Sequence, residues 1–219
     1  MLFNIQKKIL VLVITSVGII ALASGVYFSY LQHNTAPPEL AQTMWYPAEY
    51  PAIPAFNLVD QHGQAFTEKQ LQGQWHLLFF GYTHCPDVCP MTLHVLKEVQ
   101  TQLDAQQLNA NVKIILVSAD PQRDTPVVLS SYLNYFDPRF IGLTGDLTQL
   151  QQLARSVGAY FAPAEEDTES IGENPDVYNV DHSAGIFMIN PKGKPYALLQ
   201  APHDATQLTH NILTILEQP

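Results

Sequence analysis

The chain is poor in cysteine and in basic residues. Only 2 of its 219 residues are cysteine, and 10 lysines and arginines stand against 20 aspartates and glutamates, which gives a formal net charge of −10. A surface this acidic repels phosphate backbones, so we expect no nucleic acid among the partners. With no second pair of cysteines, the chain also lacks the usual ligands of a closed structural zinc site.

Several catalytic motifs are absent as well. The sequence contains no internal repeat, no glycine-rich phosphate loop and no serine nucleophile elbow. Its composition, 47% hydrophobic and 14% charged, is ample for a packed core, and 219 residues suffice for one domain plus a tail. The two cysteines are therefore the first place to look for chemistry.

A long uncharged run lies near the N-terminus. Residues 9–31 carry no charged side chain and follow Lys7 and Lys8. That length suffices to cross a bilayer as a helix, and the positive-inside rule keeps residues 1–8 in the cytoplasm. We predict a single-pass anchor in the cell inner membrane, with the rest of the chain in the periplasm. A signal peptide cleaved near Ala23 is the alternative, less favoured because the apolar run continues past that residue.

Residues 32–53 are rich in proline and show no helical or strand period. Such a composition is typical of an extended tether. We therefore predict a tether over residues 32–53 and a folded domain over residues 54–219.

Both cysteines lie in residues 76–90, HLLFFGYTHCPDVCP. Within this stretch, Leu77–Phe80 form a short apolar run that is typical of a strand buried on both faces. Apolar side chains four residues apart over Met91–Leu103 predict an amphipathic helix that packs back onto the strand. Cys85 and Cys89 therefore lie at a strand-to-helix junction.

This position predicts reactive thiols. The unpaired amides and the dipole of a helix N-terminus stabilise a thiolate and lower a cysteine pKa below ~8.5. A spacing of four lets Cys85 and Cys89 close a disulfide or share one metal ion. Redox disulfides of the thioredoxin type usually have two residues between the cysteines, whereas here there are three. Two buried small hydrophobes or a structural staple are the plain alternatives, disfavoured because both cysteines flank prolines in a polar turn.

The remaining pattern predicts an α/β fold. An apolar strand over residues 112–117 follows the helix, which implies a parallel pair joined by a crossover. Asp124 or Thr125 is expected to cap a helix that runs to Phe136. Residues 165–176 are acidic and predict a solvated loop. The other expected elements are a hairpin over 56–66, strands over 140–143, 178–180, 185–189 and 196–199, and helices over 146–157 and 206–216.

Two thiolates on a constrained loop are soft donors, which select copper(I) or zinc over hard cations. Two sulfurs and one imidazole would hold copper and leave one face open. His182 is the best of eight histidines, because in a thioredoxin-like sheet the loop before the late hairpin lies beside the cysteine turn. His84 and His94 are nearer in sequence but are expected to point away, and the others lie in the tether, a distal turn or near the last helix.

Three motifs occur in order along the chain: Gly81–Pro90 (GYTHCPDVCP), Ser118–Pro126 (SADPQRDTP) and Tyr178–Ser183 (YNVDHS). Together with the expected anchor they resemble the SCO/SenC family of copper-binding proteins, and the similarity covers residues 54–216. The resemblance implies an α/β, thioredoxin-like domain, with a central mixed β-sheet flanked by helices, preceded by one N-terminal transmembrane helix.

By the same resemblance, the copper ligands would be Cys85, Cys89 and His182, and the protein would help to assemble the dinuclear copper (CuA) site of cytochrome c oxidase. The implied partner is the copper-site subunit of that oxidase, with other periplasmic copper chaperones or thiol reductases as further candidates. Residues 120–124 would support the site or cap a helix. Asp87 would tune the site, meet a partner or remain a solvated turn residue.

Two other functions remain open at this point. A thiol-disulfide reductase that keeps the cysteines of the oxidase copper site reduced would use Cys85 and Cys89 as its redox-active pair, because thiolate reactivity underlies both exchange and ligation. A peroxidase shares the fold, but Cys85 lacks the proline and threonine placement expected around a peroxidatic thiol. Copper delivery is the leading hypothesis, with oxidoreductase activity secondary to it.

Overall fold

The computed structural model describes residues 14–27, 39–108, 111–164 and 178–218. The chain divides into a large folded unit, Leu40–Leu216, and a smaller unit made of Met1–Glu39 with Glu217–Pro219. The hydrophobic core lies within the large unit.

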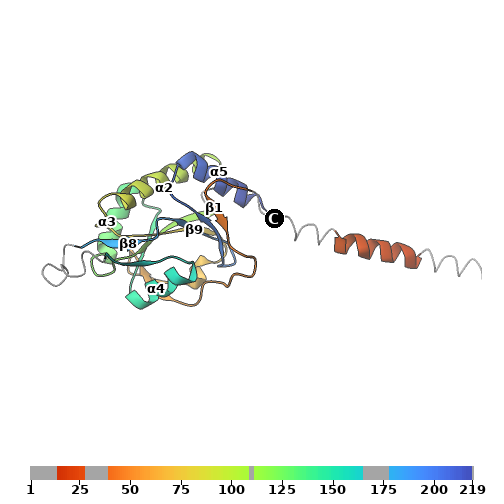
Figure 1. Ribbon diagram of the computed structural model, residues 1–219, viewed down its shortest axis with the longest axis horizontal. Coiled ribbons are helices and arrows are strands. Elements are labelled where there is room, and N and C mark those ends of the chain that lie inside the picture. Colours follow the sequence, from red (N-terminus) through yellow and green to blue (C-terminus); the bar gives the residue numbers. More distant parts are fainter. Residues whose placement is uncertain (1–13, 28–38, 109–110, 165–177, 219) are drawn as a thin grey trace, which may run out of the picture. The chain divides into compact units, whose positions relative to one another are not determined.

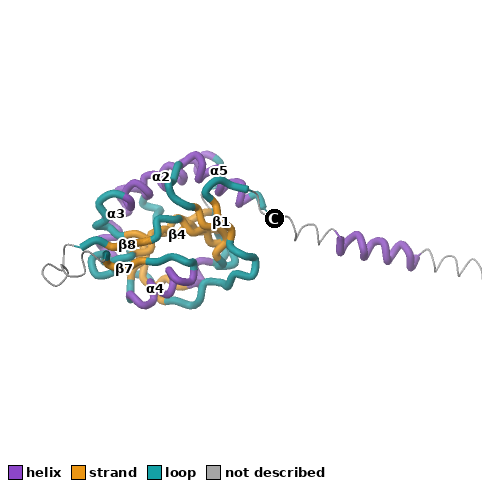
Figure 2. The backbone as a smooth tube through the Cα atoms, viewed as in Figure 1, coloured by secondary structure: helices purple, strands orange, loops and turns teal. Residues whose placement is uncertain are grey.

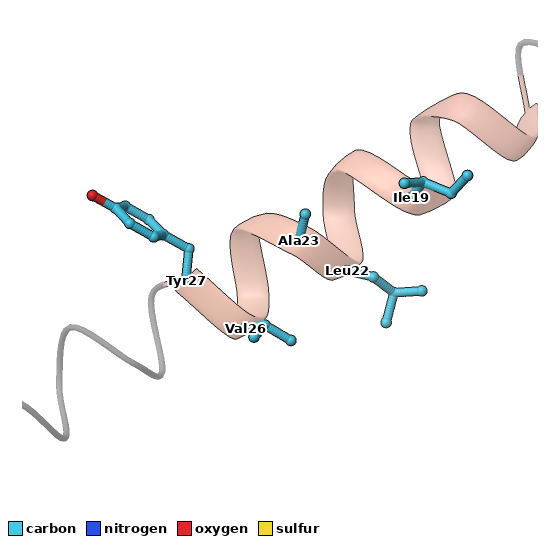
Figure 3. A pocket seen from close by; sticks show the side chains of 5 residues that line it. All are labelled: Ile19, Leu22, Ala23, Val26 and Tyr27. Carbon is cyan, nitrogen blue, oxygen red and sulfur yellow. The ribbon is translucent and has the colours of Figure 1, made fainter.

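In the smaller unit, residues 14–27 are helical and their side chains are exposed. Figure 3 shows five of these side chains standing out from the helix: Ile19, Leu22, Ala23, Val26 and Tyr27. Among the described residues, none of the helices combines the length and the apolar character that a membrane crossing requires. The anchor predicted over residues 9–31 extends outside the described residues at both ends and stays a prediction, as does the cytoplasmic segment 1–8.

Eight strands of the large unit form one mixed sheet, in the order β1-β10-β9-β4-β5-β6-β2-β3. Parallel pairs join β4 to β5 and β5 to β6, and the other neighbours are antiparallel. A separate pair joins β7 to β8. The strands are β1 (Thr43–Trp45), β2 (Asn57–Asp60), β3 (Ala65–Thr67), β4 (Trp75–Gly81), β5 (Val112–Ser118), β6 (Ile141–Thr144), β7 (Phe161–Pro163), β8 (Val180–His182), β9 (Ile186–Ile189) and β10 (Pro195–Leu199).

Strand β4 is the centre of the sheet. Its residues Leu77–Phe80 are 0% exposed, because β5 and β9 pair with its two edges and both of its faces are covered. The predicted strand buried on both faces is therefore confirmed. Gly81 at the end of β4 pairs with Ser118 at the end of β5, so the loops that follow these two strands leave the same edge of the sheet.

Helices cover both faces of the sheet. Figure 1 shows α2, α3 and α5 on one side and α4 on the other, and the backbone view in Figure 2 places the strands between them. The Thr125 side chain caps α3 by accepting from the Val128 amide, and Pro126 occupies its first position. The helices are α2 (Val88–Ala105), α3 (Pro126–Phe136), α4 (Leu147–Ser156) and α5 (Ala205–Leu216), with a short 3-10 helix, η1, at Glu68–Leu71.

The predicted α/β order and the mixed sheet flanked by helices are confirmed, and most predicted elements match within a few residues. The boundary predicted at residue 54 is too late. Strand β1 lies inside the predicted tether, pairs with β10, and is followed by Tyr46, whose hydroxyl donates to the Val157 carbonyl at 2.5 Å. The acidic loop predicted over residues 165–176, like the start of the tether at residues 32–38, lies outside the described residues.

Candidate metal centre

The two cysteines lie on the loop after β4 and in the first turn of α2. Cys85 is half-buried in the loop, and Cys89 is fully buried on the face of α2 that meets the core. Glycine is needed at position 81, because a Cβ there would lie 2.9 Å from Cys89 Sγ and 2.9 Å from Phe79 Cε1. The close approach of β4 to Cys89 therefore depends on the absence of a side chain at Gly81.

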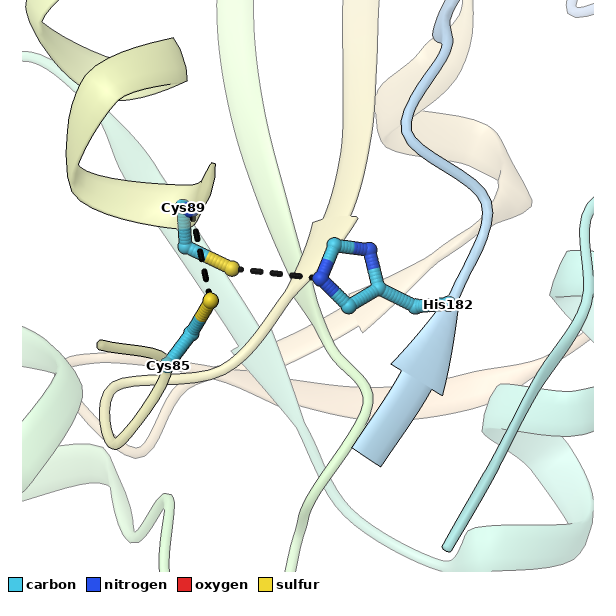
Figure 4. Close-up of side chains that lie close together, drawn as sticks. All are labelled: Cys85, Cys89 and His182. Carbon is cyan, nitrogen blue, oxygen red and sulfur yellow. Dashed lines mark hydrogen bonds between the residues drawn. The ribbon is translucent and has the colours of Figure 1, made fainter. Parts of the chain in front are cut away.

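His182 comes from the other side of the site, at the end of β8. Its Nε2 lies 3.3 Å from Cys89 Sγ, and the Cys89 amide donates to Cys85 Sγ at 3.4 Å. Figure 4 shows the three side chains pointing toward one another from the loop, from the start of α2 and from β8. The donor atoms of Cys85, Cys89 and His182 all lie within 4.8 Å of one another.

The hydrogen bond of His182 Nδ1 determines that Nε2 is the ring nitrogen with a free lone pair. Nδ1 lies 3.3 Å from the Ser183 carbonyl oxygen, which can only accept a hydrogen bond. Nδ1 therefore carries the proton, and Nε2 presents a lone pair to the sulfurs. In the metal-free protein that lone pair accepts from the Cys89 thiol, and it is equally suited to bind a metal ion.

Burial favours the neutral forms of Cys89 and His182, which corrects one prediction. Burial raises the pKa of the Cys89 thiol, and the neighbouring Cys85 raises it further. Burial likewise lowers the pKa of His182. The prediction of a depressed pKa is therefore wrong for Cys89, because removal from water outweighs the field of the helix N-terminus. A metal ion that binds here has to displace the thiol proton.

Asp124 holds the start of the cysteine loop. It is 0% exposed and accepts from the Thr83 amide at 3.1 Å, the Thr83 hydroxyl at 2.6 Å and the Ser118 hydroxyl at 2.7 Å. Thr83 is two residues before Cys85, so these bonds tie the cysteine loop to the end of β5. Of the two roles expected for residues 120–124, support of the site is confirmed for Asp124, whereas the cap of α3 is Thr125.

Asp120 and Arg123 hold the strand that carries His182. The two side chains form a buried ion pair, Asp120 accepts from the Tyr178 hydroxyl at 2.6 Å, and Arg123 donates to the Tyr178 carbonyl at 2.9 Å. The Arg123 guanidinium also lies 3.7 Å from the centroid of the Tyr178 ring. Next along β8, the Val180 amide donates to the Tyr82 hydroxyl at 3.2 Å. One motif, Ser118–Pro126, thus positions both halves of the site.

The roles of Tyr82 and Tyr178 were not predicted from the sequence. Both residues lie within two of the three motifs, Gly81–Pro90 and Tyr178–Ser183, and that position is the signal that could have identified them. The rings of Tyr82 and Phe79 pack edge-on against His182, with centroids 6.0 and 5.9 Å away. These aromatic rings restrict the orientation of the imidazole.

His84, His94 and His203 are not part of this group, as predicted. His84 is exposed and contacts the Thr83 hydroxyl, and the His94 ring packs against Phe136. His203 lies 2.8 Å from the Ala184 carbonyl oxygen. Asp87 is exposed and its side chain makes no capping hydrogen bond to α2.

Two thiol sulfurs and one imidazole nitrogen form a soft donor set. Copper(I) accepts such a three-donor site, whereas a closed structural zinc site requires four protein ligands. Within the described residues this is the one group of three or more histidine, cysteine or acidic side chains close enough to share a metal ion.

Comparison with known proteins agrees with this chemistry. A family model described as SCO1/SenC matches residues 47–217. The chain is 43% identical over 151 residues to a candidate copper-binding protein of Stutzerimonas stutzeri, covering 69% of this chain and 70% of that protein. It is 36% identical over 157 residues to the mitochondrial SCO2 homolog of Bos taurus, covering 72% of this chain but only 57% of that protein.

A solved structure extends the comparison to the fold. The crystal structure of Arabidopsis thaliana ScoI with copper bound superposes with a TM-score of 0.67 at 32% identity, covering 77% of this chain and 100% of that one. The thioredoxin-like fold expected from the resemblance is therefore confirmed. With its family match and its Cys-Cys-His group, the chain belongs to the SCO1/SenC family.

Proposed function

We propose that this protein is a membrane-anchored copper carrier that delivers copper to the CuA site of cytochrome c oxidase. The observation that carries the proposal is the convergence of Cys85, Cys89 and His182, whose donor atoms lie within 4.8 Å of one another although His182 is 93 residues from Cys89. The Arabidopsis relative with copper bound supports the choice of metal.

The geometry suits a cargo that is taken up and released. Cys89 is buried and Cys85 is half-buried, so the ion would be reached from the side of the loop. His182 already presents a lone pair, and only the thiols have to lose protons when copper enters. Three donors leave one side of the ion open, through which an acceptor thiolate or imidazole can replace the ligands one at a time.

The recipient and the location follow from the family and from the N-terminal sequence. The family resemblance supports the copper-site subunit of cytochrome c oxidase as recipient. The uncharged run of residues 9–31 after Lys7 and Lys8 supports a tether in the inner membrane, with the folded unit in the periplasm.

A thiol-disulfide reductase is the second candidate. It is favoured by one observation, since Cys85 and Cys89 are free thiols close enough for the Cys89 amide to donate to Cys85 Sγ. Cys85, which is half-buried, would be the attacking thiol, and Cys89 would resolve the mixed disulfide. The raised pKa of Cys89 disfavours the resolving step, because the thiolate is the form that attacks the mixed disulfide.

Copper titration tests the proposal. The reduced full-length protein is titrated with Cu(I) against a chromophoric chelator, and we expect one equivalent bound. His182→Ala removes one of three donors, so its loss of affinity should exceed the roughly 10–100-fold that changes around a metal ligand usually cost. His84→Ala is the matched control, because this exposed histidine adjoins Cys85 without facing the pocket. An unchanged affinity in His182→Ala would remove His182 from the site.

The same variant separates the two candidate functions. His182→Ala keeps both thiols and so remains able to form a disulfide, but it lacks the imidazole donor. In cells that depend on this protein, a carrier predicts loss of oxidase CuA assembly with His182→Ala. Normal assembly with a copper-binding-deficient variant would instead support the reductase.

A further inference from the structure

Both tryptophans of the chain lie at the end of the sheet that is farthest from the cysteines. Trp75 is the first residue of β4, whose other end, Gly81, leads into the cysteine loop about 20 Å away. Trp45 is the last residue of β1, and Tyr196 lies near the start of β10. The Tyr196 ring packs edge-on against both tryptophans, with centroids 5.6 Å from Trp45 and 5.1 Å from Trp75. All three side chains are half-buried, so each remains partly accessible at the surface.

Three lysines lie at the same end of the sheet. Lys113 is the second residue of β5, beside the start of β4. Lys192 and Lys194 lie on the turn that joins β9 to β10. The Asn190 side chain holds this turn in shape, because its Oδ1 accepts from the Lys192 and Lys194 amides at 3.0 and 3.1 Å. No ion pair joins any of the three lysines to a described residue, so no described acidic group neutralises their charges.

The end of the sheet beside the cysteines has a different charge. Asp87 precedes α2, Asp181 lies in β8, and Asp204 precedes α5, and all three are exposed. Asp204 follows His203, which lines the same cavity as Asp87. Arg123, also at this end, is bound in a buried ion pair. Because the chain has a net charge of −10, attraction to an anionic surface has to come from the end that carries the three lysines.

We propose that this lysine and tryptophan end of the folded unit docks on the anionic phospholipid headgroups of the membrane that holds the predicted anchor. The docking rests on the proposed function, in which residues 9–31 anchor the protein. The folded unit begins at Leu40, about nine residues after that run ends. Nine extended residues reach at most about 30 Å, so the unit stays in the neighbourhood of the bilayer. A tethered surface binds at a high effective concentration, so a weak contact suffices.

The side chains at this end suit a headgroup layer. Tryptophan and tyrosine are enriched at membrane–water interfaces, because each has an apolar ring with one polar group. Lysine binds lipid phosphates through its ammonium group, while its methylene chain lies along apolar surface. Docking in this way directs Cys85, Cys89 and His182 away from the membrane, toward a recipient that projects from it. The copper site then lies up to about 20 Å above the headgroups, which is the length of β4.

Fluorescence of the two native tryptophans tests this docking. The full-length protein is placed in lipid nanodiscs whose acyl chains are brominated near the headgroups, because bromine quenches nearby tryptophan. The predicted anchor contains no tryptophan, so the signal comes from the folded unit alone. Discs that contain anionic phosphatidylglycerol are compared with discs of zwitterionic phosphatidylcholine. We expect stronger quenching in the anionic discs, and loss of the difference at about 1 M salt, where the Debye length falls to about 3 Å.

Lys192→Glu and Lys97→Glu form a matched pair of variants. Both lysines are exposed, and both substitutions change the net charge by the same amount, but Lys97 lies in the middle of α2. Each lysine near an anionic surface strengthens binding roughly fivefold, so reversal of the Lys192 charge should lower the ratio of docked to undocked protein on the order of 25-fold. Lys97→Glu should stay close to the wild type, because salt screens charges beyond about 8 Å.

Equal quenching in the two lipids, or equal losses in the two variants, would overturn the docking surface. Tryptophans that stay unquenched in both lipids would overturn it as well, and would favour an acidic protein as the partner of the three lysines. A wild type that does not stay with the zwitterionic discs would refute the anchor, and the docking with it. Cu(I) affinity is measured in parallel, and docking without copper binding would support the surface while it refutes the proposed copper carrier.

Discussion

Asp124 offers a quantitative test of how the site is supported. Its carboxylate is fully buried and accepts three hydrogen bonds, two from Thr83 and one from Ser118. Asp124→Ala leaves the Thr83 amide and the Ser118 hydroxyl without an acceptor. Each buried unsatisfied donor lowers the free energy of unfolding by roughly 1–3 kcal/mol. Removal of the buried carboxylate also removes its desolvation cost, which offsets part of this, so we expect the free energy of unfolding to fall by about 3 kcal/mol. For a folded unit of this size that corresponds to a melting temperature lower by about 6–12 °C.

Thermal and urea unfolding of the metal-free protein measure this loss. Asp124→Asn is the matched control, since its amide oxygen can still accept from Thr83 and its NH₂ can donate to Ser118 Oγ, so it should lose about 1 kcal/mol. A double-mutant cycle with Thr83→Val should give a coupling energy of about 1 kcal/mol. A melting temperature for Asp124→Ala within about 2 °C of the wild type would refute the reasoning.

Two further predictions concern the packing and the pH response of β4. Gly81→Ala places a Cβ 2.9 Å from Cys89 Sγ. Overpacking should lower the free energy of unfolding, measured with urea, by roughly 1–3 kcal/mol and should also weaken Cu(I) binding. If neither quantity changes, the close approach of β4 to Cys89 is contradicted. Burial lowers the pKa of His76 from 6.5 to about 4. Between these pH values the unfolded chain therefore binds a proton at His76 that the folded chain does not bind. Stability is therefore full above about pH 6.5 and falls by up to about 3 kcal/mol as the pH drops to about 4. In His76→Gln the free energy of unfolding should depend less on pH in this window. An unchanged pH dependence in this variant would show that His76 is not its cause.

Much of the fold is readable from the sequence because its central elements follow simple patterns. Leu77–Phe80 form an apolar run in the most buried strand, and Thr125 with Pro126 begins α3. Strand β1 could not be predicted from the sequence, because its three residues lie among prolines and show no period. The strand forms through its pairing with β10. His182, predicted in a loop, is the last residue of β8, since that strand exists only through its pairing with β7.

The convergence of Cys85, Cys89 and His182 was predictable to the residue, but the electrostatics of this group were not. Sequence places Cys89 at a helix N-terminus, which lowers a thiol pKa, yet burial wins and the pKa rises. Burial depends on how β4 approaches α2, which no local pattern reveals.

X-ray absorption at the copper edge tests the central claim most directly. The reduced full-length protein is loaded with one equivalent of Cu(I), and the ligand shell is compared between the wild type and His182→Ala. The account predicts two sulfur ligands and one nitrogen ligand in the wild type, from Cys85, Cys89 and His182, with loss of the nitrogen in the variant. A wild-type shell that contains sulfur alone, or a nitrogen that persists without His182, would contradict it.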